Sequence, residues 1–339
     1  MLRYILKRLI WLLVVLFGLC VITFTLSRVV PGDPAAAYIG PRARPEQVEL
    51  VRQQLGLDRP LYVQFGFYLR DLAHGNFGES LRTHRPVLRG IVDHLPASLE
   101  LMFSAIIIAL FLGIPIGVVS ARRENTVVDH LSRLFSVANV SMPSFWLAMI
   151  FQIVFFRWLG LFPIGGRIDT VTALLHPIEK ITGFSIVDAV ISGNWVALRN
   201  VLLHLVLPSV TLAAYSTGLI ARMTRSTMLE VLREDYITTA RSIGVSESEI
   251  HFIHALRNAI GPTLTTAGLC FASMLTGTFF IELIFFWPGL GTYTINAIFL
   301  NDYPVIMAVT LLMALFYVAV NLCVDLLLAI ADPRIRISK

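Results

Sequence analysis

Long apolar runs are the feature that most restricts what this chain can fold into. Runs of mostly apolar residues lie near 9–28, 99–120, 134–156, 201–221, 263–285 and 305–330. A helix of about 20 apolar residues matches the thickness of a bilayer's hydrocarbon core. Charged residues make up only 14% of the chain, well below the roughly 25% of a soluble domain. The sequence therefore predicts an all-α, polytopic membrane protein with about six transmembrane helices.

Basic residues mark the expected orientation of these helices. They precede the first run, follow the last one and fill the polar segment between the fourth and fifth runs, whereas the short loop between the last two runs has no Lys or Arg. Basic residues in short loops favour the cytoplasmic side. We therefore expect both termini to be cytoplasmic, and the net charge of +5 reflects topology rather than a nucleic-acid partner.

The order of runs and polar segments suggests three regions. Residues 1–29 form an N-terminal transmembrane helix, 30–97 an external domain, and 98–339 a core that contains a cytoplasmic segment at about 223–262. Within the external domain, Pro45 and Pro60 are expected to open helices, because proline is favoured at the first helical position. A third short helix is expected over 86–93. A disordered linker is disfavoured by the aromatic content of this region.

The polar segment carries small residues at helical spacing. Ala240 and Gly244 are one helical turn apart. Small residues at that spacing leave a shallow notch on one helix face, where another protein's backbone can come close. The spacing predicts a surface that a partner grips.

A second helix start follows directly. Ser246 is expected to cap it, Glu249 to complete a capping box, and Val245 with Ile250 to form a hydrophobic staple. Pro262 is expected to end or kink this helix. The two helices, meeting at a tight turn, should project from the bilayer as a knob.

Short motifs along the whole chain carry a family resemblance: PGDP at 31–34, LGLD at 55–58, GNFG at 75–78, SMPSFW at 141–146, WPGLG at 287–291 and DPRIR at 332–336. Together with the Ala-x3-Gly spacing, they resemble the permease subunits of binding-protein-dependent ABC importers, in the dipeptide, oligopeptide and nickel transport group. The resemblance implies the type I importer permease fold, with an external domain after the first helix.

The same resemblance implies a function. The chain would be a non-catalytic permease subunit of the bacterial inner membrane, forming half of a pathway for dipeptides or short oligopeptides. Its implied partners are a second homologous permease, two ATPase subunits and a periplasmic or extracellular substrate-binding protein. ATP and Mg²⁺ would bind the ATPases, because this chain has no G-x-x-x-x-G-K-[ST] phosphate loop. No cofactor or metal is expected on the chain itself.

In such permeases the polar segment is the loop that couples to the ATPase. The resemblance therefore implies ATPase contact through Ala240, Gly244, Val245, Ser246 and Glu249. The chain departs from the general pattern at 238–239, where two threonines replace the usual Glu-Ala. Nickel, glutathione and antimicrobial-peptide permeases share most of these motifs, so those substrates stay open as alternatives.

Several residues near the membrane are candidates for the pathway or a gate. Glu282 lies near the outer end of the fifth run, where an ionisable group is expensive and therefore often functional; the alternative is a helix-end group that pairs locally. Trp287, Pro288 and Gly289 form a rigid turn, read either as an interfacial anchor or as part of a gate. Asp325 is assigned a structural hydrogen-bonding role ahead of a pathway role.

Two other classes of protein fit the sequence less well. An ion-coupled secondary transporter needs coupling-ion ligands inside the membrane and usually repeated halves, and the sequence shows neither. A membrane enzyme needs His, Asp or Glu clustered at one membrane face, and no such cluster is apparent.

Overall fold

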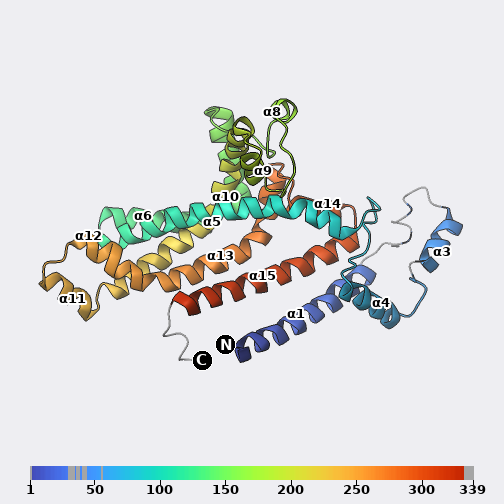
Figure 1. The fold of residues 1–339 in the computed structure, drawn as a ribbon, viewed down its shortest axis with the longest axis horizontal. Coiled ribbons are helices and arrows are strands. Elements are labelled where there is room, and N and C mark those ends of the chain that lie inside the picture. The colour runs from blue at the N-terminus through green and yellow to red at the C-terminus, as the bar shows by residue number, and fades with distance from the viewer. Residues whose placement is uncertain (1, 30–34, 36–38, 40–43, 55, 332–339) are drawn as a thin grey trace. The chain divides into compact units, whose positions relative to one another are not determined.

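The chain is mostly helical in the part that the computed structural model describes, residues 2–29, 35, 39, 44–54 and 56–331. These residues contain no β-strand, only an isolated bridge between Glu79 and Pro86. In chain order (Figure 1) the elements are α1 (Leu2–Val29), α3 (Pro45–Gln54), α4 (Leu61–Ala73), α5 (Val87–Arg122), α6 (Val127–Ser141), α7 (Ser144–Phe151), the π-helix η1 (Gln152–Trp158), α8 (Thr170–Leu175), α9 (Ser185–Ile191), α10 (Trp195–Val231), α11 (Asp235–Ser242), α12 (Glu247–Glu249), the π-helix η2 (Ile250–Ala255), α13 (Leu256–Ile284), α14 (Leu290–Phe299) and α15 (Tyr303–Ala331).

Five helices among the described residues are long and apolar enough to cross a membrane, or up to six if one bent pair counts as a span. The bent pair joins α6 to α7 and η1 through an angle of 106°. Pro143 explains the break, because a proline pushes the preceding residue out of the helical region, and Met142 is extended at φ −80° and ψ 128°. The expectation of about six spans is confirmed, with the third one broken.

The chain divides into two compact units, residues 1–95 with 292–318 and residues 96–291 with 319–339. In the first unit, α3 and α4 begin beside Pro45 and Pro60 as expected. The expected short helix at 86–93 is wrong, because these residues belong to the 36-residue helix α5, which continues through Pro96. The domain boundary expected near residue 97 therefore falls inside a helix.

A buried carboxylate organises part of the first unit. Asp302, just before α15, accepts hydrogen bonds from Ser80 Oγ at 2.5 Å and from the Leu81 backbone N–H at 3.1 Å. Both interactions are buried, so they hold the turn before α5 against the start of α15.

In the second unit, α5 and α10 approach each other closely through small residues. A Cβ added at Gly117 would lie 2.5 Å from Thr224 Cβ and 2.7 Å from the Ala221 carbonyl oxygen, and one at Gly113 would lie 2.8 Å from Ile220 Cγ2. Real Cβ atoms do not come so near, so both positions need glycine. Small residues serve this purpose in membrane helices, where close backbone packing replaces the hydrophobic effect.

A buried ion pair ties the α5–α6 turn to α10. Asp129 has no solvent-exposed side-chain surface and accepts bonds from Arg225 Nε at 2.6 Å and Nη2 at 2.8 Å. Ser120 Oγ at 2.6 Å and the Asn125 N–H at 3.0 Å also donate to it. A carboxylate with this many donors is well compensated for burial. Arg225 is one of the basic residues near the polar segment that indicate orientation, but its pairing with Asp129 could not be predicted from the sequence.

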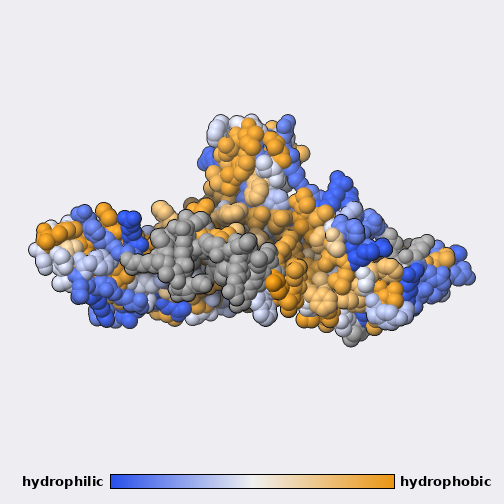
Figure 2. Space-filling model, turned by 60° about the horizontal axis from the view of Figure 1, so that its bottom comes forward, coloured by the Kyte–Doolittle hydropathy of each residue, from blue (hydrophilic) through white to orange (hydrophobic). Residues whose placement is uncertain are grey.

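Pro262 was expected to end or kink the helix after the polar segment. It lies inside α13 and does not end it, so the first of these two alternatives is wrong. Membrane helices tolerate internal proline where neighbouring groups satisfy the freed carbonyl. Figure 2 shows apolar residues exposed over the long helices and hydrophilic residues gathered around α11 and α12, the pattern expected of membrane spans joined by a polar segment.

Candidate functional site

The turn after α11 is closed by a glycine in the left-handed conformation. Gly244 has φ +84°, its N–H bonds the Arg241 carbonyl at 3.0 Å, and the Val245 N–H bonds the Ala240 carbonyl at 3.1 Å. These two bonds make a Schellman motif, in which the glycine follows the last helical residues. The expectation that Ala240 and Gly244 share one helix face is therefore wrong, because α11 ends at Ser242.

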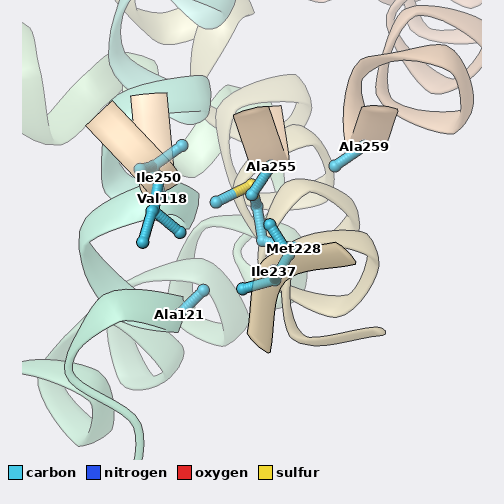
Figure 3. Packing of buried hydrophobic residues seen from close by; sticks show 7 residues of the cluster. All are labelled: Val118, Ala121, Met228, Ile237, Ile250, Ala255 and Ala259. Atoms are coloured by element: carbon cyan, nitrogen blue, oxygen red, sulfur yellow. The ribbon is translucent and has the colours of Figure 1, made fainter. Parts of the chain in front are cut away.

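A buried hydrophobic cluster packs against the helices on both sides of this turn. Its buried members come from α5, α10, α11, η2 and α13 of the second unit (Figure 3): Val118, Ala121, Met228, Ile237, Ile250, Ala255 and Ala259. Full burial of a side chain such as Ile237 or Ile250 contributes about 1.5–3 kcal/mol. Ala240 and Val245 are partly buried against the same cluster. Ala240 therefore faces inward and anchors α11 rather than lining an outer notch.

The start of the next helix is capped on one side only. Ser246 Oγ accepts the Glu249 N–H at 3.2 Å, which confirms the N-cap. Among the described residues, the Glu249 side chain makes no return bond to Ser246, so only half of the capping box forms. Val245 and Ile250 both pack on the cluster, as a hydrophobic staple requires. We call residues 235–249 the α11–α12 knob.

The outer face of the knob presents an apolar tip that the sequence analysis missed. Ile243 is 75% exposed, next to the glycine turn. Across the turn, Arg241 Nε bonds Glu247 Oε1 at 2.8 Å, and Tyr236 Oη accepts from Asn258 Nδ2 at 2.7 Å. An exposed isoleucine between helices can insert into a partner's groove. Its signal in the sequence was a large apolar residue just before a turn glycine.

Glu282, a candidate for the gate, is fully buried near the end of α13. Ser98 Oγ donates to Glu282 Oε1 at 2.5 Å and accepts the Leu290 N–H at 2.8 Å. A Cβ at Gly289 would lie 2.5 Å from Glu282 Oε1, and one at Gly291 would lie 2.8 Å from Oε2. The two glycines therefore make room for the carboxylate. This geometry favours the alternative of local pairing.

The neighbouring tryptophan also serves packing. Trp287 is fully buried and donates from Nε1 to the Ala97 carbonyl at 2.8 Å, which favours a packing role over an interfacial anchor; within Trp287–Gly289, Pro288 is the exposed residue. Arg167 lies over the Trp287 ring, 5.7 Å from its centroid, and forms an ion pair with Glu100. The sequence analysis missed this pair.

Glu100 and Arg167 also hold the segment before α9. Glu100 Oε1 accepts the Ile186 N–H at 2.7 Å, and Arg167 Nη2 donates to the Gly183 carbonyl at 3.1 Å. Next to them, Asp188 accepts the Thr182 hydroxyl at 2.6 Å. Burial raises the pKa of Asp188, but bonds from Thr182 and nearby backbone N–H groups outweigh it and leave the pKa below its usual value. Charged side chains therefore connect α5, the loop before α8 and the start of α9 at this end of the unit.

The break between α6 and α7 borders a cavity of about 250 Å³. Hydroxyl groups of Ser144, Thr211, Ser216 and Ser273 line it, together with Tyr215 and apolar residues, and its lining has no ionisable carboxylate, Lys, Arg or His. The walls come from α6, α7, α10 and α13, all of the second unit. The surface of this cavity among spanning helices is mostly apolar, and its polar groups carry no charge.

One predicted position, Asp325, remains. The side chain of Asp325 lies outside what the structure describes. No group of three or more His, Cys, Asp or Glu among the described residues could hold a metal ion.

Comparison with known proteins decides the family. The family model described as binding-protein-dependent transport system inner membrane component matches residues 113–337, and the N-terminal model of the same transport systems matches residues 1–102. This chain belongs to that family.

Several relatives match nearly the whole length of this chain. A probable D,D-dipeptide transport system permease protein of Escherichia coli K12 is 45% identical, covering 96% of this chain and 94% of the relative. A dipeptide transport system permease protein of Alkalihalophilus pseudofirmus is 41% identical over 99% and 100%. A glutathione transport system permease protein of Escherichia coli K12 is 38% identical over 99% of both chains.

A solved structure supports the fold independently. The MetNI methionine ABC transporter, in an inward-facing conformation, matches with a TM-score of 0.51 at 14% identity, covering 73% of this chain and 96% of that one. This likeness confirms the permease fold expected from the sequence. The chain is thus a multi-pass membrane component of an ABC transport system.

Proposed function

We propose that this chain is the permease subunit of an ATP-driven importer for dipeptides or short oligopeptides, and that the α11–α12 knob receives the motion of the ATPase. One observation carries the proposal: in a chain of this family, a glycine-closed turn exposes Ile243 on a rigid base of buried residues. A rigid base lets a force on the turn move α5, α10 and α13 together. A floppy loop would absorb that force.

Peptide substrates are supported by the names of the relatives and by the cavity. Two close relatives are named dipeptide permeases. The cavity beside α7 offers hydroxyls and no fixed charge, which suits a peptide backbone whatever its side chains are. Glutathione, itself a tripeptide, is the second candidate, because one relative at 38% identity is named for it.

The remaining parts of the proposal concern partners and orientation. A second homologous permease completes the pathway, two ATPase subunits bind ATP and Mg²⁺, and an external binding protein delivers the peptide. The knob and both termini face the cytoplasm, as the basic residues favour. The chain itself performs no catalysis, in keeping with the lack of a phosphate-binding loop in its sequence.

Uptake by the assembled complex tests this proposal. The chain is co-expressed with a homologous second permease, two ATPase subunits and a binding protein, and the complex is reconstituted in liposomes. We expect accumulation of radiolabelled dialanine that needs ATP and the binding protein, with weaker uptake of glutathione. Uptake driven by an ion gradient without ATP would overturn the assignment. Stronger uptake of glutathione would replace the substrate but keep the mechanism.

A further inference from the structure

A second cavity lies in the first unit, beside the turn before α5 that Asp302 holds. Its volume is about 440 Å³, and it is lined by the end of α1, the turn before α5 and the start of α15. A smaller cavity of about 170 Å³ shares Ser27, Arg28 and Asn76 with it. The shared walls make the two cavities one continuous candidate site.

Two hydrogen-bond donors in this site have no partner among the residues that the structure describes. These are the buried atoms Arg28 Nε and Tyr303 Oη. Arg28 also lies over the Phe24 ring, 5.3 Å from its centroid. Buried donors without partners are rare and costly in folded proteins. A ligand with acceptor oxygens would satisfy both.

The position of the site along the helices sets its depth in the membrane. Arg28 is the last residue of the first candidate span, Ile10–Arg28, and Tyr303 is the first residue of the last one, Tyr303–Val324. Both residues line one cavity, so these span ends lie at the same face of the bilayer. Arg and Tyr at span ends sit at the level of the lipid head groups. A ligand at this depth is either a lipid head group or a solute in the interface.

Charge in the lining distinguishes the ligand further. Glu79 lines the larger cavity and Asp71 the smaller one. A purely anionic ligand would meet these carboxylates unfavourably, whereas a ligand with an anion and a cation a few bonds apart satisfies both signs. The apolar walls, which include Leu57, Leu81 and Met307, accommodate the glycerol backbone and first methylenes of a lipid.

We propose that this site binds the head group of a zwitterionic phospholipid, with the phosphate on Arg28 and Tyr303 and the ammonium toward Glu79 and Asp71. The bound lipid holds α1 and α15 together at this face of the membrane. A peptide presents the same chemistry through its carboxylate and ammonium termini, so the experiment must separate the two sources. The site is independent of the proposed transport function.

Native mass spectrometry of the full complex released from nanodiscs tests the site. The nanodiscs contain equal amounts of phosphatidylethanolamine and phosphatidylglycerol. We expect phosphatidylethanolamine to be retained preferentially, and its retained fraction to fall about tenfold in Arg28→Gln, the scale expected for a lost charge-assisted hydrogen bond. Tyr303→Phe should give a smaller loss. Arg82→Gln, a change at an exposed arginine in the same unit, is the matched control and should retain the lipid.

Other outcomes decide against the proposal. Equal retention of phosphatidylethanolamine by the wild type and Arg28→Gln would refute the proposed site. Preferential retention of phosphatidylglycerol would refute the claim that the site selects a zwitterionic head group. Displacement of the lipid by millimolar dialanine would assign the site to peptide termini. If Arg28→Gln fails to assemble, Met307→Trp fills the cavity while leaving Arg28 and Tyr303 in the sequence, and retention by that variant would equally refute the proposal.

Discussion

The buried pair between Asp129 and Arg225 gives the sharpest prediction of stability. In Asp129→Asn the side chain keeps its shape and can still accept from Ser120 Oγ, but the charge that faces Arg225 is lost. Removing one partner of a buried pair costs about 3–5 kcal/mol, because the other charge stays buried alone. Arg225 keeps 19% of its side chain exposed, so we expect the lower end, about 3 kcal/mol.

Equilibrium unfolding of the purified chain in mixed detergent micelles measures this loss of stability. In the assembled complex, the variant's ATPase subunits should dissociate at a lower temperature than those of the wild type. Asp129, on α6, is bonded to Ser120 of α5 and Arg225 of α10, and these two helices both contribute to the cluster under the knob. The variant should therefore weaken the coupling of ATP hydrolysis to uptake more than it weakens hydrolysis itself.

An exposed ion pair nearby supplies the control. Arg233 and Glu124 are 3.5 Å apart, with 73% and 38% of their side chains exposed. Exposed pairs contribute about 0–1 kcal/mol, so Glu124→Gln should change stability little. Equal losses in Asp129→Asn and Glu124→Gln would show that burial of the pair is not what matters, and would refute the reasoning.

Three further changes test other parts of the account. Gly244→Ala should lower the free energy of unfolding by about 1 kcal/mol because of its positive φ, with a smaller loss in Gly244→Asn; equal losses in thermal melts would exclude a backbone cause. Single cysteines introduced at the exposed positions Asn76 and Glu179 should react with an impermeant maleimide in intact cells. A cysteine at Ser248 should react only after permeabilisation, and its labelling in intact cells would reverse the expected topology. Trp287→Phe should cost about 1–3 kcal/mol by leaving a buried carbonyl without its donor, and a variant as stable as the wild type in the same unfolding assay would contradict that role.

The sequence predicted those features that follow from local pattern. Apolar run length gave the spans, Pro45 and Pro60 gave the starts of α3 and α4, and Ser246 gave a helix cap. Each depends on residues within a few positions of one another, so spacing alone is informative.

Features that depend on distant contacts were not predictable in this way. The partners Ser98 and Glu282 are 184 positions apart, and Asp129 and Arg225 are 96 apart. The continuation of α13 through Pro262 also depends on neighbouring helices. Gly244 shows the limit best: its spacing from Ala240 suggested a shared helix face, but its positive φ places it in the turn beyond the helix.

Cross-linking from the tip of the knob tests the central claim most directly. A photoreactive benzoylphenylalanine is placed at Ile243 in the assembled complex, and a second one at the exposed Glu179 serves as the control. The account predicts a covalent adduct with an ATPase subunit from position 243 and none from position 179. Absence of an ATPase adduct at 243, or equal adducts from both positions, would contradict the claim that the ATPase acts through the α11–α12 knob.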